Sequence, residues 1–364
     1  MNATVRKALG QIGAPVLAIV VAALLCSIVI AASGANPLEI YGLMIEFGST
    51  PASMVAVIDK WTVYFLAGIA ASIGFKMLLF NIGIDGQYRM ATFAAAVVGG
   101  AVVLPAPLHI ALIIVTGMVV GALWAAIAGL LKVMRGVSEV ISTIMLNAVA
   151  TGLIAFMLSP ERLGYQAPGS NNITTPVFAP SAHLPGIPFL GGDVFGMVVV
   201  AILGGIAYWV VLSRTRFGFD LRASGLSLRA ARVSGVSSKR MILVTIMISG
   251  AVAGLVGMPQ LLGGSHAYTL DFPAGYGMSG LAIALLGRTH PLGVAAAAFL
   301  WGFIERSGQI LDLNDIPKEI VTIMQGIIVI CVVIAYEIVR RIENRQQQRV
   351  AGRVEAARMS GASA

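Results

Sequence analysis

Residues Leu108–Leu131 read LHIALIIVTGMVVGALWAAIAGLL, an apolar run without a single Asp, Glu, Lys or Arg. A helix needs about 20 mostly apolar residues to cross the hydrocarbon core of a bilayer, which is about 30 Å thick. This run is long enough, and its only ionisable side chain is that of His109. It therefore predicts a transmembrane helix.

The composition of the whole chain extends this prediction. The 364 residues are 58% hydrophobic and 11% charged, with a mean hydropathy of +0.90. A soluble domain carries about 25% charged residues, so the water-soluble classes are excluded. The 42 glycines favour helices packed through small residues over a β-barrel. Cys26 and Cys331 lie in separate apolar runs and predict neither a disulfide framework nor a metal site. We expect an all-α polytopic membrane protein.

Scanning outward from Leu108–Leu131 gives nine further apolar runs. The eighth and ninth are short, which predicts half-helices or a helical hairpin that does not fully cross the membrane. The ten candidate spans are Ala14–Ala32, Trp61–Phe80, Met90–Leu104, Leu108–Leu131, Glu139–Leu158, Val194–Leu212, Met241–Leu262, Ala274–Gly287, Pro291–Ile304 and Ile320–Tyr336.

The distribution of basic residues predicts the orientation, because Lys and Arg of short loops stay on the cytoplasmic side. With a cytoplasmic N-terminus, all but four of the 24 basic residues fall inside, and this holds only for an even number of crossings. We therefore expect ten spans with both termini in the cytoplasm. Topology then explains the net charge of +8 without a nucleic-acid partner. The four basic residues left outside are Lys60, Arg162, Arg306 and Lys318.

Three segments interrupt the membrane domain, residues 1–340. Residues 159–192 are rich in Pro, Gly and Asn and are expected outside, as a docking surface or as a connecting loop with a short surface helix. Residues 213–240 form a basic cytoplasmic loop, with a short amphipathic helix around Leu226–Val233 between Gly225 and Gly235. This helix lies on the membrane surface or fits the groove of a partner. Residues 341–364 are a basic cytoplasmic tail to which we assign no chemistry.

Three motifs occur in a fixed order along the chain: FNIGIDGQ at Phe80–Gln87, GVSEVISTIMLN at Gly136–Asn147 and SGAVAGLVG at Ser249–Gly257. With the basic loop, they resemble the permease subunits of bacterial ABC importers for nucleosides, within the ribose and branched-chain amino acid permease superfamily. The resemblance covers about Leu17–Glu337. Asp85 stands where related permeases commonly carry Glu, and Ser227 where an Asn is often found.

The resemblance implies the ABC importer permease fold, with ten helices and no ATP site of its own. The sequence agrees, because it contains no GxxxxGK[ST] phosphate loop. Residues 213–240 then correspond to the coupling segment that docks into the ATPase. The implied partners are a second permease chain, a paralogue, together with an ABC ATPase that holds ATP and Mg²⁺ and an extracytoplasmic substrate-binding lipoprotein. The coupling residues are Gly225, Leu226, Arg229, Ala230, Ala231 and Gly235.

Polar side chains within the spans mark either a pathway or contacts between helices. One group lies beside Gly83 and Gly86, where a helix can break and open towards a cavity or be capped by its own side chains. Another forms a stripe along the fifth span, and Gln260 lies near a possible outer gate. Asn, Gln and Asp side chains suit ribose hydroxyls and base edges. The candidate pathway residues are Asn81, Asp85, Gln87, Glu139, Ser142, Thr143, Asn147 and Gln260.

These features together predict a transport subunit of a bacterial cytoplasmic membrane that is not itself an enzyme. Nucleosides are the expected substrate, with a simple sugar such as ribose as the alternative. An ion-coupled secondary carrier is a weaker rival, because the spans lack a charge relay. GMSG at Gly277–Gly280 matches rhomboid-type proteases, but no later span supplies the required histidine, so we expect no catalytic residue.

Overall fold

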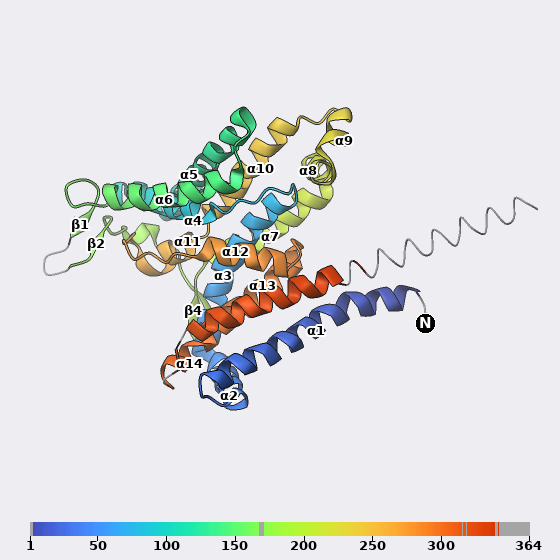
Figure 1. Ribbon diagram of the computed structural model, residues 1–364. Coiled ribbons are helices and arrows are strands. Elements are labelled where there is room, and N and C mark those ends of the chain that lie inside the picture. Colours follow the sequence, from blue (N-terminus) through green and yellow to red (C-terminus); the bar gives the residue numbers. More distant parts are fainter. Residues whose placement is uncertain (1–2, 167–170, 315, 318, 339–340, 342–364) are drawn as a thin grey trace, which may run out of the picture. The chain divides into compact units, whose positions relative to one another are not determined.

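The computed structural model describes residues 3–166, 171–314, 316–317, 319–338 and 341 (Figure 1). The chain forms two compact units: Met1–Glu46 with Gly308–Ala364, and Phe47–Ser307. The tail predicted at 341–364 lies outside the described residues, apart from Arg341.

The smaller unit is built from helices at both ends of the chain. Its elements are α1 (Ala3–Ala32), most of α2 (Pro37–Gly48), α14 (Gln309–Asp312) and a last helix, Glu319–Ile338. Helix α2 was not predicted, and it bends by 110° from Ala18–Ala32. The buried residues Ala18, Ala22, Cys26 and Ile30 recur every four positions and so line one face of α1.

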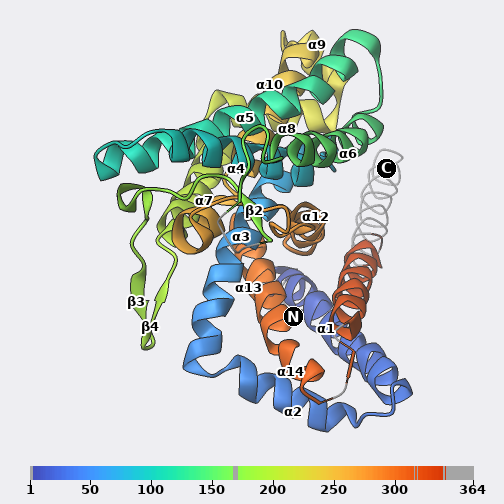
Figure 2. The ribbon, with the colours of Figure 1, turned by 90° about the vertical axis from the view of Figure 1, so that its left-hand side faces the viewer.

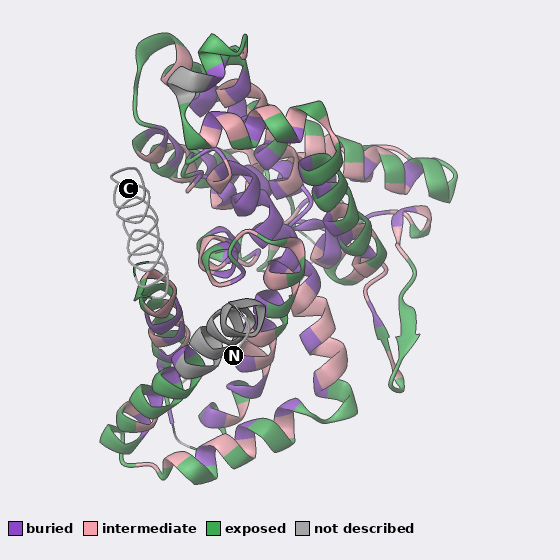
Figure 3. Cartoon of the chain, turned by 90° about the vertical axis from the view of Figure 1, so that its right-hand side faces the viewer, coloured by how far each residue is buried: buried purple, intermediate pink, exposed green. Residues whose placement is uncertain are grey.

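The larger unit is arranged around α3, most of whose residues are buried. Helix α3 packs against α7, α10, α12 and α13, and a second group is formed by α4, α5, α6 and α10 (Figure 2). Figure 3 shows the buried residues concentrated in the interior of this unit, with the outward helix faces exposed. Its longer helices are α3 (Pro51–Phe75), α4 (Ile84–Ala101), α5 (Ala106–Arg135), α6 (Glu139–Met157), α7 (Met197–Arg214), α8 (Arg216–Leu226), α10 (Ser238–Ala253), α12 (Tyr276–Leu286) and α13 (Pro291–Ser307).

Helices α5 and α10 lie in backbone contact through four glycines. A Cβ atom on Gly121 would lie 2.3 Å from the carbonyl oxygen of Gly250, and one on Gly254 would lie 2.2 Å from that of Gly117. The contact is that close because glycine has no side chain, as in small-residue interfaces between membrane helices. The central run Leu108–Leu131 thus becomes α5 and buries its glycine face.

The span predictions are confirmed in part. Among the described residues, six helices are long and apolar enough to cross a membrane, or seven if Ala18–Ala32 and Pro37–Gly48 form one bent span. Helix α12 has 11 residues and rises about 16 Å, too short for a crossing, as expected for the eighth run. The total of ten spans stays a prediction.

Both boundaries of α3 differ from the predicted span. Helix α3 begins at Pro51, capped by the side chain of Thr50, and not at Trp61. It ends at Phe75, five residues before the predicted Phe80. The predicted span Met241–Leu262 lies within the apolar helical stretch Ser238–Ser265, in which α10 is followed by α11 (Met258–Gln260) and the π-helical turn η2 (Leu261–Ser265).

The loop at residues 159–192, which was predicted to lie outside, contains a 3₁₀ turn, η1 (Pro180–Ala182), but its main elements are hairpins that were not predicted. Strand β1 (Tyr165–Gln166) pairs with β2 (Ile173–Thr174), and β3 (Ile187–Phe189) pairs with β4 (Gly192–Val194). Backbone bonds from Thr175, Phe178 and Leu184 tie the loop to residues 262–268. The loop is therefore packed on the segment after α10.

Candidate functional site

The chain leaves the helical path between α3 and α4. Residues 76–83 contain turns, and Leu78 has a φ of 56°, in the left-handed region. Backbone groups exposed by such a break must find partners where they are buried, because an unpaired buried N–H or C=O group is costly. The predicted break is therefore present, but Gly86 lies inside α4 and only Gly83 lies at the boundary.

Two predicted residues close the break by pairing with each other. Asn81 Nδ2 donates to Gln87 Oε1 at 2.9 Å, and Gln87 Nε2 donates to Asn81 Oδ1 at 2.8 Å. Asn81 also donates to Ser249 Oγ of α10, which donates to the carbonyl oxygen of Ala70 in α3. Both amides are 1% exposed. Here they tie α3, α4 and α10 together.

Asn147 of α6 joins this arrangement from the other side. Its Oδ1 accepts the backbone N–H of Gly86 at 2.8 Å, and its Nδ2 donates to the carbonyl oxygen of Ile82 at 3.0 Å. Thr143 covers Gly83 so closely that a Cβ atom there would lie 2.8 Å from Thr143 Cβ. The polar stripe of α6 therefore packs against the break through these two residues.

The first turn of α6 makes separate contacts. Glu139 is buried and forms a hydrogen-bonded ion pair with Lys132 of α5. Ser142 Oγ donates to the carbonyl oxygen of Ser138 at 3.0 Å. Gln260 is half-buried in α11 and lies beside Gly264, after the end of α10. None of these three residues makes a hydrogen bond to the break among the bonds of the described residues.

Asp85 caps the N-terminus of another helix. Its Oδ1 accepts the backbone N–H groups of Gly275 at 2.9 Å and Gly277 at 3.2 Å, and its Oδ2 accepts that of Met278 at 3.3 Å. These groups open α12, where a carboxylate is stabilised by unpaired donors and by the helix dipole. The NIGIDGQ motif segment is thereby tied to α12, more than 180 residues later.

We expect Asp85→Ala to lower the free energy of unfolding by about 1–2 kcal/mol, because three donors of α12 lose their charged acceptor. Thermal unfolding of the purified protein in detergent measures this change. Asp220→Ala is the control, because that carboxylate caps no helix among the described termini. Equal stability of the two variants would contradict the capping role of Asp85.

A polar cluster at the centre of α3 was not predicted. We call Lys60, Tyr64, Tyr276 and Glu305 the Lys60 cluster. Lys60 Nζ lies 2.6 Å from Glu305 Oε1, and the hydroxyl of Tyr64 donates to Glu305. The ring of Tyr276 stands edge-on to that of Tyr64, with centroids 5.6 Å apart, and the Lys60 ammonium lies 5.8 Å from the Tyr276 centroid.

The Lys60 cluster combines charge, aromatic rings and partial exposure. The side chains of Lys60 and Glu305 are 32% and 29% exposed, so the ion pair is open on one side. Tyr88 of α4 extends the aromatic surface, with its ring 5.8 Å from Tyr276. Charged residues at membrane depth mark functional sites more often than not. The missed signal was the Thr50–Pro51 cap, which places Lys60 inside α3 and not in an outer loop.

Residues 213–240, the segment expected to couple to the ATPase and called the coupling segment for that reason, contain two helices where one was predicted. Helix α8 ends at Leu226, Ser227 is extended with a φ of −160°, and α9 covers Leu228–Val233. Gly225 lies in the last turn of α8, and the break before α9 comes two residues later, at Ser227. A Cβ atom on Gly225 would lie 2.1 Å from the carbonyl oxygen of Lys76, at the start of the break.

The surface of the coupling segment is apolar at both ends of α9. Leu226 is 89% exposed and Val233 is 90% exposed, whereas Ala231 is buried. Gly235 has a φ of 85°, which ends α9 in the left-handed conformation that glycine favours. The side chains of Arg229 and Ala230 lie outside the described part of the chain.

The described residues contain no cluster of His, Cys, Asp and Glu side chains able to hold a metal ion. What the site offers is hydrogen bonding, aromatic surface and one partly exposed ion pair, on helices α3, α4, α12 and α13. This chemistry suits the weak binding of a polar small molecule.

Comparison with known proteins gives consistent matches. The family described as branched-chain amino acid transport system / permease component matches residues 53–333. The chain is 34% identical over 283 residues to the guanosine ABC transporter permease protein NupP of Bacillus subtilis, covering 77% of this chain and 81% of NupP. It is 29% identical to the glucose ABC transporter permease protein TsgB13 of Haloferax volcanii, covering 87% and 86%. It is 28% identical to the nucleoside ABC transporter permease protein NupB of Lactococcus lactis, covering 92% and 93%.

Proposed function

Since this chain belongs to the family of branched-chain amino acid transport system permease components, and is an ABC permease of the nucleoside and sugar type, we propose that it carries nucleosides. The identity of 34% to a guanosine permease, over most of both chains, carries this proposal. The nucleoside permease NupB adds support. The similarity to a glucose permease keeps a simple sugar as the second candidate. An ion-coupled secondary carrier has no counterpart among these relatives.

The proposed subunit has ten spans, with both termini in the cytoplasm of a bacterial cell, as the distribution of basic residues favours. It works with a second permease chain, a substrate-binding lipoprotein outside and an ABC ATPase inside. The ATPase holds ATP and Mg²⁺, because this sequence has no phosphate loop. This chain itself needs no cofactor in the proposal.

In the proposed mechanism, ATP binding moves the coupling segment and so alternates access to the pathway. Gly225 touches the backbone of Lys76, and the break that begins there continues into α4. Asp85 at the start of α4 in turn holds the N-terminus of α12. Movement of α8 therefore reaches α12, which carries Tyr276 of the Lys60 cluster, through direct contacts.

The predicted pathway residues divide by burial in this proposal. Asp85 and Gln260 are half-buried and contact the substrate during passage. Tyr276 offers a ring face for the base, and Lys60 and Glu305 hydrogen-bond the ribose. The others act by holding the lining helices in place, through the contacts described above; they are Asn81, Gln87, Glu139, Ser142, Thr143 and Asn147.

Uptake of radiolabelled uridine and ribose tests the substrate. Cells lacking the gene, and cells with the gene restored, are compared with the proton gradient intact or collapsed while ATP is maintained. We expect uridine uptake to depend on the gene and to survive collapse of the gradient. If cells without the gene lost only ribose uptake, the proposed substrate would be a sugar and not a nucleoside. If uptake stopped when the proton gradient collapsed, a secondary carrier would be favoured.

The Lys60 cluster supplies a separate prediction. Glu305→Leu leaves Lys60 without its partner, and we expect a loss of about 2 kcal/mol in the free energy of unfolding. The double variant Lys60→Met, Glu305→Leu recovers most of that stability, because both charges are gone. If the pair contacts substrate, the double variant stays deficient in uptake although it is stable. Normal uptake by the double variant would leave the pair a structural role only.

A further inference from the structure

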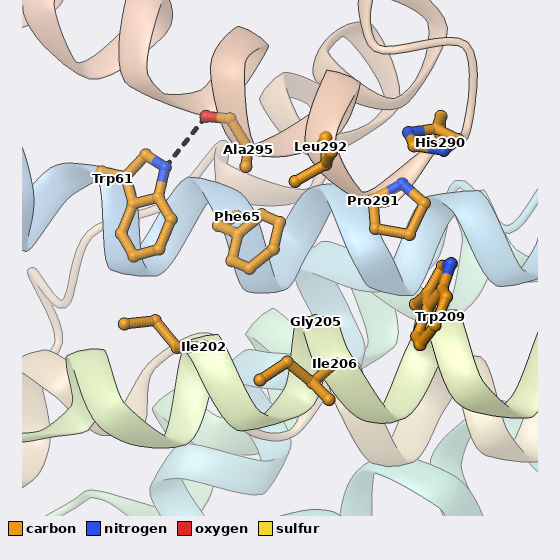
Figure 4. Close-up of a pocket in the computed structure, with 10 residues that line it drawn as sticks. All are labelled: Trp61, Phe65, Ile202, Gly205, Ile206, Trp209, His290, Pro291, Leu292 and Ala295. Atoms are coloured by element: carbon orange, nitrogen blue, oxygen red, sulfur yellow. Dashed lines mark hydrogen bonds between the residues drawn. The ribbon is translucent and has the colours of Figure 1, made fainter.

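An apolar groove runs along the outside of the larger unit between α3, α7 and α13 (Figure 4). Its volume is about 370 Å³, within the range of small-molecule sites. Trp61 and Phe65 of α3 form its floor, opposite Ile202 and Ile206 of α7. With almost no polar lining, the groove has nothing with which to bind a nucleoside or a sugar, and it suits a hydrocarbon chain.

The groove continues into a basic mouth at one end. A second cavity of about 210 Å³ shares Trp209, His290 and Pro291 with the groove, and Lys76 and Arg222 contribute to its lining. No ion pair among the described residues involves either of these cations. Burial and the nearby Arg222 guanidinium lower the pKa of Lys76, as expected when two cations share a site without an anion.

Trp209 marks the depth of this mouth in the membrane. It lies near the end of α7, the residue is 45% exposed, and the Arg214 guanidinium lies 6.0 Å from the centroid of its ring. Tryptophan with flanking arginine is typical of the headgroup level of a bilayer. In the orientation proposed above, the mouth belongs to the cytoplasmic leaflet, whose anionic lipids attract basic clusters.

We infer that the groove and its basic mouth form a binding site for one anionic phospholipid of the inner leaflet. An acyl chain lies between α3, α7 and α13, and the headgroup phosphate lies between Lys76 and Arg222. The hydroxyl of Ser213, which also lines the mouth, donates to the carbonyl oxygen of Trp209 at 2.6 Å, so the two cations supply the phosphate contacts. The positive charges of Lys76 and Arg222 favour an anionic lipid over a neutral lipid. The apolar groove favours a lipid over free phosphate, because free phosphate has no acyl chain to bury.

Bound lipid at this site connects to the coupling segment. Arg222 lies on α8, one turn before Gly225, which touches the backbone of Lys76. A phosphate between Lys76 and Arg222 therefore screens their repulsion next to the contact through which α8 reaches the break. This places the lipid where it stabilises the junction between the coupling segment and the membrane helices.

The test uses quenching of tryptophan fluorescence by lipids with brominated acyl chains. The full chain is reconstituted in phosphatidylethanolamine vesicles that contain either brominated phosphatidylglycerol or brominated phosphatidylcholine. Trp124 and Trp301 are replaced by Phe, because their Nε1 atoms have no hydrogen-bond partner among the described residues. Trp61 and Trp209, both of which line the groove, then report contact with the acyl chain.

We expect brominated phosphatidylglycerol to quench at a lower mole fraction than brominated phosphatidylcholine. Lys76→Gln with Arg222→Gln should reduce this preference about thirtyfold, at about 1 kcal/mol for each basic residue. The matched control is Arg216→Gln with Arg240→Gln, which removes the same charge from exposed cytoplasmic positions away from the mouth. An equal preference in the two double variants would overturn the assignment.

A second pair of variants tests the groove itself. Ala295→Phe fills the groove from α13, whereas Ala296→Phe places the same ring on the exposed neighbouring position. We expect the first to reduce quenching by both lipids and the second to leave it unchanged. Equal quenching by the two lipids in the unaltered protein would overturn the charge selectivity. A complete absence of quenching would mean that another protein segment covers the groove, and would overturn the lipid site.

Discussion

Gly225→Ala is expected to abolish uptake while ATP hydrolysis by the assembled transporter continues. The added Cβ atom would lie 2.1 Å from the carbonyl oxygen of Lys76 and 3.4 Å from Cα of Met77. Both contacts are with backbone, which cannot rotate away as a flexible side chain does. Helix α8 must therefore move off the start of the break, and the path from the coupling segment to α4 is interrupted.

The experiment measures ATP hydrolysis and uridine uptake together in proteoliposomes that contain the transporter with its partner subunits. Gly152→Ala is the matched control, because a Cβ atom there meets no other heavy atom within 4 Å. We expect the control to retain both activities. Normal uptake by Gly225→Ala would contradict the coupling assignment, and so would loss of hydrolysis in a correctly assembled complex.

Gly121→Val is expected to have the largest effect on stability. A Cβ atom at this position would lie 2.3 Å from the carbonyl oxygen of Gly250 and 3.1 Å from the backbone of Gly254. Helices α5 and α10 would have to separate along their closest contact, at a cost of about 3 kcal/mol. For a membrane protein of ordinary stability, this is a large share of the total.

The amount of folded protein in the membrane and its thermal unfolding in detergent measure this effect. Gly152→Val, on the open face of α6, is the control for adding a β-branched residue to a membrane helix. Gly250→Val should match Gly121→Val, because its Cβ atom would lie 2.4 Å from the carbonyl oxygen of Gly121. If neither Gly121→Val nor Gly250→Val changed the thermal unfolding, the backbones of α5 and α10 would be farther apart than in the structure.

Motifs in the sequence are sufficient to locate the break between α3 and α4. Asn81, Asp85 and Gln87 stand out as polar groups beside glycine in an apolar region, and the structure places all three at the junction of α3 and α4. Their partners could not be predicted, because Asn81 meets Ser249 of a distant helix and Asp85 meets α12. Spacing along the chain carries no information about such contacts.

The Lys60 cluster was missed for a related reason, because its members lie far apart in the sequence. Lys60 lies next to the first residue of an apolar run, so hydropathy assigned it to an outer loop. The Thr50 cap starts α3 ten residues earlier and brings Lys60 level with Glu305 of α13. Hydropathy averages over a window and therefore misses a single charge that a distant partner neutralises.

The sequence by itself determined the class of protein, because the free energy of moving a run such as Leu108–Leu131 out of water depends only on that run. The sequence alone also contains the uneven distribution of Lys and Arg that predicts the orientation, and the motifs that resemble those of permeases. The tertiary structure decided which glycines carry helix contacts, which carboxylate caps α12, and where the groove meets Lys76 and Arg222. Those features depend on atoms brought within a few ångströms by packing, and only the folded chain contains them.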